Sequence, residues 1–349
     1  MAFNDKITGV IEGFYGRPWS WQYRQRYARF LAHQGFNTYI YAPKSDPWLR
    51  KLWREPWPNS QLTALKSLRQ AYRKQGVRFG LGFSPFELYC RFDQPSKDLL
   101  DDKLRQIDQL SPDVFCILFD DMRGDVPGLA ARQREIIEYI AGRTTASKLI
   151  VCPTYYSDDV VLEKVFGAMP ANYLEDFAVG LDRSIEVFWT GERVCSEEYS
   201  SQHLLDVERR LGRKPLIWDN YPVNDGRITS NFLHIDSPEN RDCLEYTAGL
   251  LANPMNQAAL SALPLSGLAK QLFGAGKVHT AESWQPSLAL QKFLMDNIKV
   301  FQVEGLSSLD KRNKQLLLKT MMALDEPGVE EVKEWLNGQY VFDPACLTE

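Results

Sequence analysis

Short apolar runs alternate with amphipathic helical patterns along most of this chain, and the alternation limits the folds that it can adopt. The rhythm extends from residue 6 to about residue 274 and is typical of repeated βα units. The runs that we interpret as strands are residues 7–12, 38–42, 77–82, 114–119, 149–152, 186–189, 216–218 and 249–252. Eight such strands predict an α/β fold, namely a closed (β/α)8 TIM barrel, which needs about 250 residues.

The segments between the strands carry helical spacing, and so does the end of the chain. The helical patterns cover residues 23–33, 62–74, 97–109, 129–142, 160–167 and 203–211. An open dinucleotide-binding sheet is disfavoured because Gly80-Leu81-Gly82-Phe83-Ser84-Pro85 lacks the third glycine of its fingerprint. Past residue 281 the strand pattern stops, so we predict a (β/α)8 barrel over 1–280 and a short C-terminal helical appendix over 281–349, packed on the barrel.

Composition and charge restrict the partners. Hydrophobic residues make up 44% and charged residues 25% of the chain, as in soluble globular proteins. The net charge of −4 argues against nucleic acid, and we interpret the basic stretch 24–29 as the solvated face of a helix. We find no leader pattern at the N-terminus and no apolar run approaching 18 residues. A cytoplasmic protein without a membrane partner, monomeric or homodimeric, is the expectation.

The cysteines and histidines suggest neither disulfides nor a metal. Six cysteines are scattered without a Cys-x-x-Cys pair, and Cys116 and Cys152 lie inside apolar strand patterns, which favours reduced core thiols. Four histidines form no His-Glu-x-x-His helix. We therefore expect no metal and no cofactor.

Two adjacent carboxylates, Asp120 and Asp121, end the apolar run 114–119. In a barrel the C-terminal strand ends carry the chemistry. Neighbouring carboxylates interact so that one can stay ionised while the other holds a proton near neutral pH, as acid/base catalysis requires. The simpler alternative is a strand-terminal aspartate that caps the next helix beside a solvated neighbour.

Polar and aromatic groups also follow most of the other predicted strands. They are the segment 12–19 with its glycines and aromatics, Lys44, Cys152, Tyr155, Tyr156, Trp218, Asp219, Asn220, Asn224, Asp225 and Asn253. A cationic donor, carboxylates, amides and phenols on one rim predict a polyhydroxylated ligand.

Six segments resemble the glycoside hydrolase family 84 β-N-acetylglucosaminidases, which include the O-GlcNAcases. In chain order they are GVIEGFYGRPW (9–19), YAPK (41–44), FDD (119–121), CPTYY (152–156), WDNYPVND (218–225) and ANP (252–254). The resemblance covers roughly the whole barrel, and the glycine-aromatic and Trp-Asp-Asn segments are its most specific parts.

The resemblance implies a retaining exo-β-N-acetylglucosaminidase that removes terminal β-linked GlcNAc from a glycan or from Ser/Thr of a glycoprotein. The substrate's own 2-acetamido oxygen would be the nucleophile, and an oxazoline would be the intermediate. Asp120 would accept the acetamide N–H and balance the charge of the oxazolinium. Asp121 would protonate the leaving oxygen and later deprotonate water.

The resemblance also implies the substrate contacts. Tyr156, Cys152 and Trp218 would form the acetamide pocket, with Tyr156 donating to the acetamido oxygen and Trp218 facing the methyl group. Asn220 is similar to the family residue that helps to hold the acetamide and its aspartate.

The remaining contacts implied by the resemblance go to the sugar hydroxyls. Lys44, Asn253 and the backbone of Gly13 would lie on the side of the 3-hydroxyl. Asp225 would accept from the 4- and 6-hydroxyls, so a substituent there would leave its carboxylate unpaired and enforce exo-action.

Three other readings stay open. A non-catalytic sugar-binding barrel would be expected to lack Asp120 or Asp121. A hydrolase of chitin-like or hyaluronan-like chains would have an open cleft in place of a closed pocket. A divalent-cation enzyme using Asp120, Asp121 and Asp125 would lose activity to a chelator, although this spacing matches no metal loop that we recognise.

Overall fold

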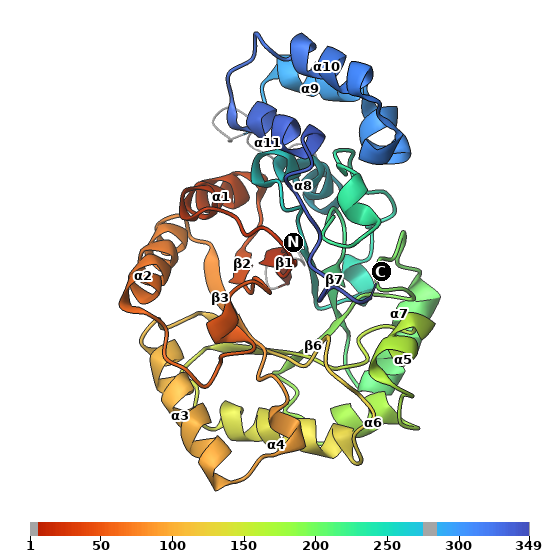
Figure 1. Ribbon diagram of the computed structural model, residues 1–349. Coiled ribbons are helices and arrows are strands. Elements are labelled where there is room, and N and C mark those ends of the chain that lie inside the picture. The colour runs from red at the N-terminus through yellow and green to blue at the C-terminus, as the bar shows by residue number, and fades with distance from the viewer. Residues whose placement is uncertain (1–5, 275–284, 349) are drawn as a thin grey trace.

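Eight parallel strands close into a barrel in the computed structural model, which describes residues 6–274 and 285–348. Each strand pairs with the next, and β8 pairs with β1 to close the ring (Figure 1). The strands are β1 (Ile7–Glu12), β2 (Thr38–Tyr41), β3 (Arg78–Phe83), β4 (Val114–Leu118), β5 (Lys148–Cys152), β6 (Glu186–Trp189), β7 (Leu216–Asp219) and β8 (Gly249–Ala252). The predicted TIM barrel is confirmed, and the strand bounds differ by at most one residue at either end.

A ring of helices surrounds the barrel, as Figure 1 shows. The helices are α1 (Trp21–Gln34), α2 (Asn59–Lys74), α3 (Gln94–Asp108), α4 (Leu129–Ala141), α5 (Val160–Phe166), α6 (Tyr173–Ala178), α7 (Ser201–Leu211) and α8 (Ala258–Phe273). Several begin at a residue whose side chain accepts a backbone N–H of the first turn, which satisfies a donor that the helix leaves unpaired: Ser20, Asp93, Asp159 and Ser200. The sequence predicted neither α6 nor α8.

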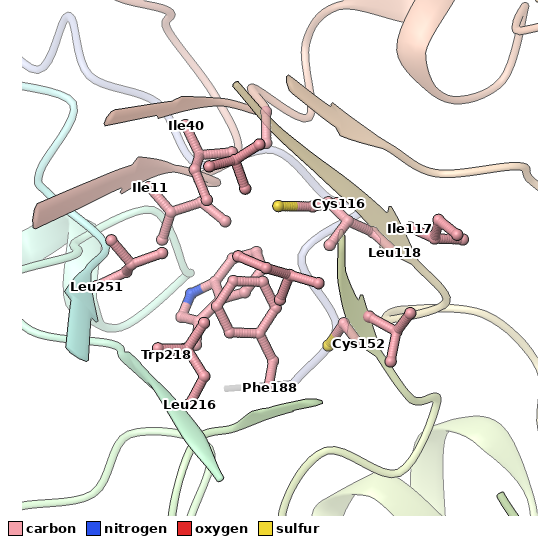
Figure 2. Packing of buried hydrophobic residues seen from close by; sticks show 14 of the residues in the cluster. Ile11, Ile40, Cys116, Ile117, Leu118, Cys152, Phe188, Leu216, Trp218 and Leu251 are labelled. Atoms are coloured by element: carbon pink, nitrogen blue, oxygen red, sulfur yellow. The ribbon is translucent and has the colours of Figure 1, made fainter. Parts of the chain in front are cut away.

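Apolar side chains from the strands fill the barrel interior. Figure 2 shows Leu216, Trp218, Phe188 and Leu251 gathered there, with Cys152 beside them. The Phe188 and Trp218 rings meet nearly edge to face, with their centroids 5.2 Å apart. Cys116 and Cys152 are buried free thiols, as the sequence predicted. The packed interior supports the strand ends, which form the mouth of the barrel.

The basic stretch 24–29 is not uniformly solvated, which corrects the sequence prediction. Arg26 and Arg29 are exposed, but Arg24 is buried and forms an ion pair with Glu12, with 2.6 Å between Nη2 and Oε1. The Tyr39 hydroxyl also donates to Glu12. Glu12 is therefore paired within the fold, between β1, α1 and β2, and contributes to structure.

The helices after the barrel contribute to a second apolar core, and α11 packs on α8. They are α9 (Leu288–Asp296), a π-helical turn (Lys299–Glu304), α10 (Lys311–Thr320) and α11 (Pro327–Leu336). Glu331 of α11 is buried and accepts the backbone N–H groups of Ala259 and Leu260 at the start of α8, at 2.9 and 3.0 Å. The predicted boundary between residues 280 and 281 lies outside the described residues.

None of the helices in residues 6–274 and 285–348 combines the length and the apolar composition that a membrane crossing requires.

Candidate active site

One cavity lies at the C-terminal ends of the strands, and every site residue predicted from the sequence lines it. These residues are Gly13, Lys44, Asp120, Asp121, Cys152, Tyr156, Trp218, Asn220, Asp225 and Asn253. They lie at or just after the C-terminal ends of β1, β2, β4, β5, β7 and β8. Residues as far apart in sequence as Gly13 and Asn253 meet there because parallel strands end on one face.

Asp120 and Asp121 both face this cavity although they are neighbours in sequence. Successive residues of an extended strand point to opposite sides. Asp121 instead has φ of 54°, a left-handed conformation that is uncommon outside glycine, and its carbonyl oxygen accepts Arg50 Nη2 at 3.0 Å. Strained backbone that is held by its surroundings is typical of functional sites.

Asp120 has one paired and one unpaired oxygen. Lys44 Nζ forms an ion pair with Oδ2 of Asp120, and the two side chains are 3% and 7% exposed. Lys44 Nζ also lies 4.0 Å from Asp121 Oδ2. Among the described residues, Oδ1 of Asp120 is buried and accepts no hydrogen bond. A buried acceptor without a donor is costly, so the free site presents an oxygen suited to an N–H of a ligand.

Two tyrosines donate to Asp121. The Tyr15 hydroxyl lies 2.7 Å from Oδ2, and the Tyr156 hydroxyl lies 3.0 Å from Oδ1. Burial, followed by the charge of Asp121, raises the pKa of both phenols well above its ordinary value, so both remain protonated donors. Burial, with a smaller contribution from Asp120, likewise raises the pKa of the Cys152 thiol and keeps it neutral.

The Trp218 indole forms an apolar wall of the cavity. Its Nε1 donates to Asn220 Oδ1 at 3.0 Å, and Asn220 Nδ2 donates to the carbonyl of Val194 at 2.9 Å. A Cβ at Gly13 would lie 2.3 Å from Trp218 Cζ2, so only glycine lets β1 end against the ring. Asn220 thus fixes the indole, and Gly13 leaves room for it.

Asp225 and Asn253 lie at the part of the rim formed by β1, β7 and β8. Asp225 Oδ2 accepts the Tyr15 backbone N–H at 2.7 Å, and burial raises the pKa of Asp225 to about 6. Asn253 Oδ1 accepts the Gly13 N–H at 3.2 Å, and its Nδ2 donates to Asn220 at 3.0 Å. The Gly13 N–H is therefore paired within the protein.

Several lining residues were not among the predicted site residues. Tyr15 belongs to the glycine-aromatic segment, and Thr190 directly follows β6, so the rule that strand ends carry function could have found both. Cys346 and Thr348 also line the cavity, from the far end of the chain. No local pattern marks these two, because their position depends on the path of the chain after α11.

Asp125, which the metal-dependent reading would use, is not a lining residue of this cavity. Its carboxylate pairs at the surface with Arg123, with Nε 2.8 Å from Oδ1. Within the part of the chain that the structure describes, no three or more His, Cys, Asp or Glu side chains are grouped in a way that could hold a metal ion.

A closed parallel barrel with paired carboxylates in a deep, partly apolar pocket at its C-terminal mouth has the architecture of a barrel glycoside hydrolase. The sequence profile of the beta-N-acetylglucosaminidases matches residues 8–301. The chain belongs to this family, glycoside hydrolase family 84, which confirms the resemblance found in the sequence.

Named relatives agree with this assignment. Protein O-GlcNAcase of Rattus norvegicus and that of Mus musculus are each 32% identical to this chain over 261 residues, which amount to 71% of this chain and 28% of the relative. A solved structure of a Thermobaculum terrenum O-GlcNAc hydrolase mutant superposes with a TM-score of 0.73 at 28% identity, over 95% of this chain and 80% of that one. This chain therefore spans less than a third of the length of these curated relatives.

Proposed function

We propose that the protein is a retaining exo-β-N-acetylglucosaminidase that removes a terminal β-linked GlcNAc by substrate-assisted catalysis. The acetamido oxygen of the sugar attacks its own anomeric carbon, the leaving group departs as an alcohol, and water opens the resulting oxazoline. Asp120 and Asp121 are the two catalytic carboxylates.

The unpaired Oδ1 of Asp120 is the observation that carries the proposal. Lys44 pairs with the other oxygen, so the carboxylate is fixed in place. An acetamide N–H is a donor that would satisfy Oδ1. Once bound there, the acetamide is oriented for attack, and the negative charge lies beside the positive charge that grows on the oxazolinium nitrogen.

Asp121 is assigned to the general acid and base. In the free site it accepts from both Tyr15 and Tyr156. When substrate binds, Tyr156 would turn its hydroxyl toward the acetamido oxygen and release Asp121. Asp121 would then be free to turn toward the leaving oxygen, to which the general acid donates its proton.

The surroundings fit a terminal sugar. Trp218 and Cys152 offer an apolar surface for the acetamide methyl, and a neutral Cys152 adds no charge there. Asp225 lines the cavity and is only partly exposed, so hydroxyls that pair with its carboxylate are largely shielded from water. Substituting those hydroxyls would remove their hydrogen bonds to Asp225 and leave the carboxylate unpaired, which favours exo-action.

The requirement for the acetamide tests the proposal. Turnover of an aryl β-N-acetylglucosaminide should greatly exceed turnover of the matching β-glucoside. Replacing the acetyl group by mono-, di- and trifluoroacetyl should slow the reaction steeply, because a less basic carbonyl oxygen is a poorer nucleophile. Rates that do not respond to fluorination would contradict substrate assistance and indicate a nucleophile on the enzyme.

A further inference from the structure

Arg50 is a buried cation to which the proposed reaction gives no role. It directly follows the short 3-10 helix Pro47–Leu49 in the connection between β2 and α2, and it is 6% exposed. Its guanidinium forms no ion pair with a carboxylate among the described residues, and its Nη1 is buried there without a hydrogen-bond partner. A buried charge with an unsatisfied donor is costly, so stability alone does not account for Arg50.

The guanidinium is directed at the backbone of Asp121. Its Nη2 donates to the Asp121 carbonyl oxygen at 3.0 Å, and no other donor within residues 6–274 and 285–348 bonds to that oxygen. A hydrogen bond from a charged donor is stronger than one between neutral groups. Arg50 also interacts electrostatically with Asp121 and Asp120. The Asp121 carbonyl is thus held by a cation.

Two aromatic rings lie beside the guanidinium and limit its movement. Its Cζ lies 5.2 Å from the centroid of the Phe86 ring and 5.9 Å from that of the Tyr15 ring. Attraction of this kind between a cation and a ring contributes about 0.5–2 kcal/mol. Tyr15 in turn donates its hydroxyl to Asp121 Oδ2. Arg50 therefore contacts Asp121 directly through the backbone and indirectly through Tyr15.

The backbone of Asp121 needs such support. Its φ of 54° lies in the left-handed region, which costs a residue other than glycine about 1–2 kcal/mol. Hydrogen bonds from Tyr15 and Tyr156 hold the carboxylate, but they leave the peptide group itself unsupported. Without the bond from Arg50, the backbone could relax to an ordinary conformation and carry the carboxyl group away from the sugar pocket.

We propose that Arg50 is a positioning residue for the general acid, because it holds Asp121 in the left-handed backbone conformation that turns its carboxyl group into the sugar pocket. The proposal rests on the proposed function, which assigns the acid role to Asp121. Arg50 does not line the sugar pocket, so it acts through Asp121 and not on the sugar. A displacement of about 1 Å can cost about 100-fold in rate, which sets the scale of the expected effect.

Arg50→Met tests the proposal with two substrates that differ in their need for an acid. Methionine removes the donor and the charge but keeps a long side chain. For methyl β-N-acetylglucosaminide, kcat/KM should fall roughly 10- to 100-fold, with the loss in kcat and KM unchanged, because the contacts to the sugar remain. For the 4-nitrophenyl glycoside, whose leaving group needs little protonation, the loss should stay below about 3-fold. A merely structural residue would affect both substrates alike.

Arg54→Met is the matched control. Arg54 is an exposed arginine of the same connection, and its guanidinium lies over the Trp53 ring at 4.4 Å, away from the residues that line the sugar pocket. Both rates should stay within about twofold of wild type. Thermal unfolding of each variant checks that it is folded. If Arg50→Met does not fold, Arg50→Lys, which lacks the planar fork, is judged by the same ratio of the two substrates.

Equal losses on the two substrates, or no loss on the methyl glycoside, would overturn the proposal. Asp121→Asn is measured in parallel, and if it shows no dependence on the leaving group, the assignment of the general acid in the proposed function fails. Arg50 is then judged by the crystal structure of Arg50→Met. An Asp121 that has left the left-handed region supports a positioning role, and an unchanged Asp121 refutes it.

Discussion

Replacing Gly13 by alanine tests whether the Trp218 indole must stay where it is. The new methyl carbon would lie 2.3 Å from Cζ2 and 2.8 Å from Cη2 of the ring, well inside van der Waals contact. The ring has little freedom to retreat, because it is 5% exposed, its Nε1 donates to Asn220 and it packs against the Phe188 ring. Either the indole or the end of β1 must therefore shift.

Overpacking of this kind costs about 1–3 kcal/mol. If that free energy is lost from transition-state binding, kcat/KM for an aryl β-N-acetylglucosaminide should fall roughly 5- to 150-fold, at about 1.4 kcal/mol per factor of ten. Most of the loss should be in kcat, because the displaced wall no longer holds the acetamide against the anomeric carbon.

Gly142→Ala is the matched control. Gly142 ends α4 with φ of −73°, and a methyl group there would meet nothing closer than 3.6 Å. Kinetics and thermal unfolding of both variants form the assay. A folded Gly13→Ala enzyme with kcat/KM within about twofold of wild type would refute the assignment of Trp218 to the acetamide wall.

Three further predictions concern buried charges. Burial raises the pKa of Asp225 from 3.8 to about 6 in the folded protein. The free energy of unfolding should therefore fall as pH rises from 3.8 through 6, because the unfolded chain loses this proton first. At pH 8 the Asp225→Asn variant should therefore have a free energy of unfolding in urea about 1–3 kcal/mol higher than wild type. Its kcat/KM should fall at least about 100-fold. Burial raises the pKa of Glu331 to about 8, so the wild-type free energy of unfolding should decline from pH 4.5 toward pH 8. The Glu331→Gln variant should lack this decline when urea unfolding at about pH 5 is compared with that at about pH 9. Glu12→Ala should lower the free energy of unfolding in denaturant by about 3–5 kcal/mol, because it leaves the buried Arg24 guanidinium without its ion-pair partner. Replacing Glu12 and Arg24 together by leucine should lower it less than the single change.

The barrel could be predicted because its strands are buried on both faces and read as short apolar runs bounded by turns. The same rule placed Asp120, Asp225 and Asn253 at one mouth, since parallel strands end on one side. Helix α8 escaped prediction because α11 covers its outer side, so it is buried almost all round and shows little amphipathic period. Pro264 within it also contradicts a simple helical pattern.

Features that depend on contacts between residues far apart in the chain could not be predicted from the sequence. In the sequence Arg24 is one of several basic residues in a helical stretch and is expected to be solvated. Its burial depends on the ion pair with Glu12 of β1. The unpaired Oδ1 of Asp120 likewise depends on Lys44 arriving from β2. The segment that brings Thr348 to the sugar pocket has no motif, because its place is set by how α11 packs on α8.

Leaving-group dependence of the Asp120→Asn and Asp121→Asn variants tests the central assignment most directly. If Asp121 is the general acid, Asp121→Asn should fail on alkyl glycosides but keep much more activity on a nitrophenyl glycoside, whose departure needs little protonation. Asp120→Asn should lose roughly 100-fold or more on good and poor leaving groups alike, because an amide cannot balance the oxazolinium charge. A leaving-group-sensitive Asp120→Asn would reverse the two roles, and two unimpaired variants would contradict the account as a whole.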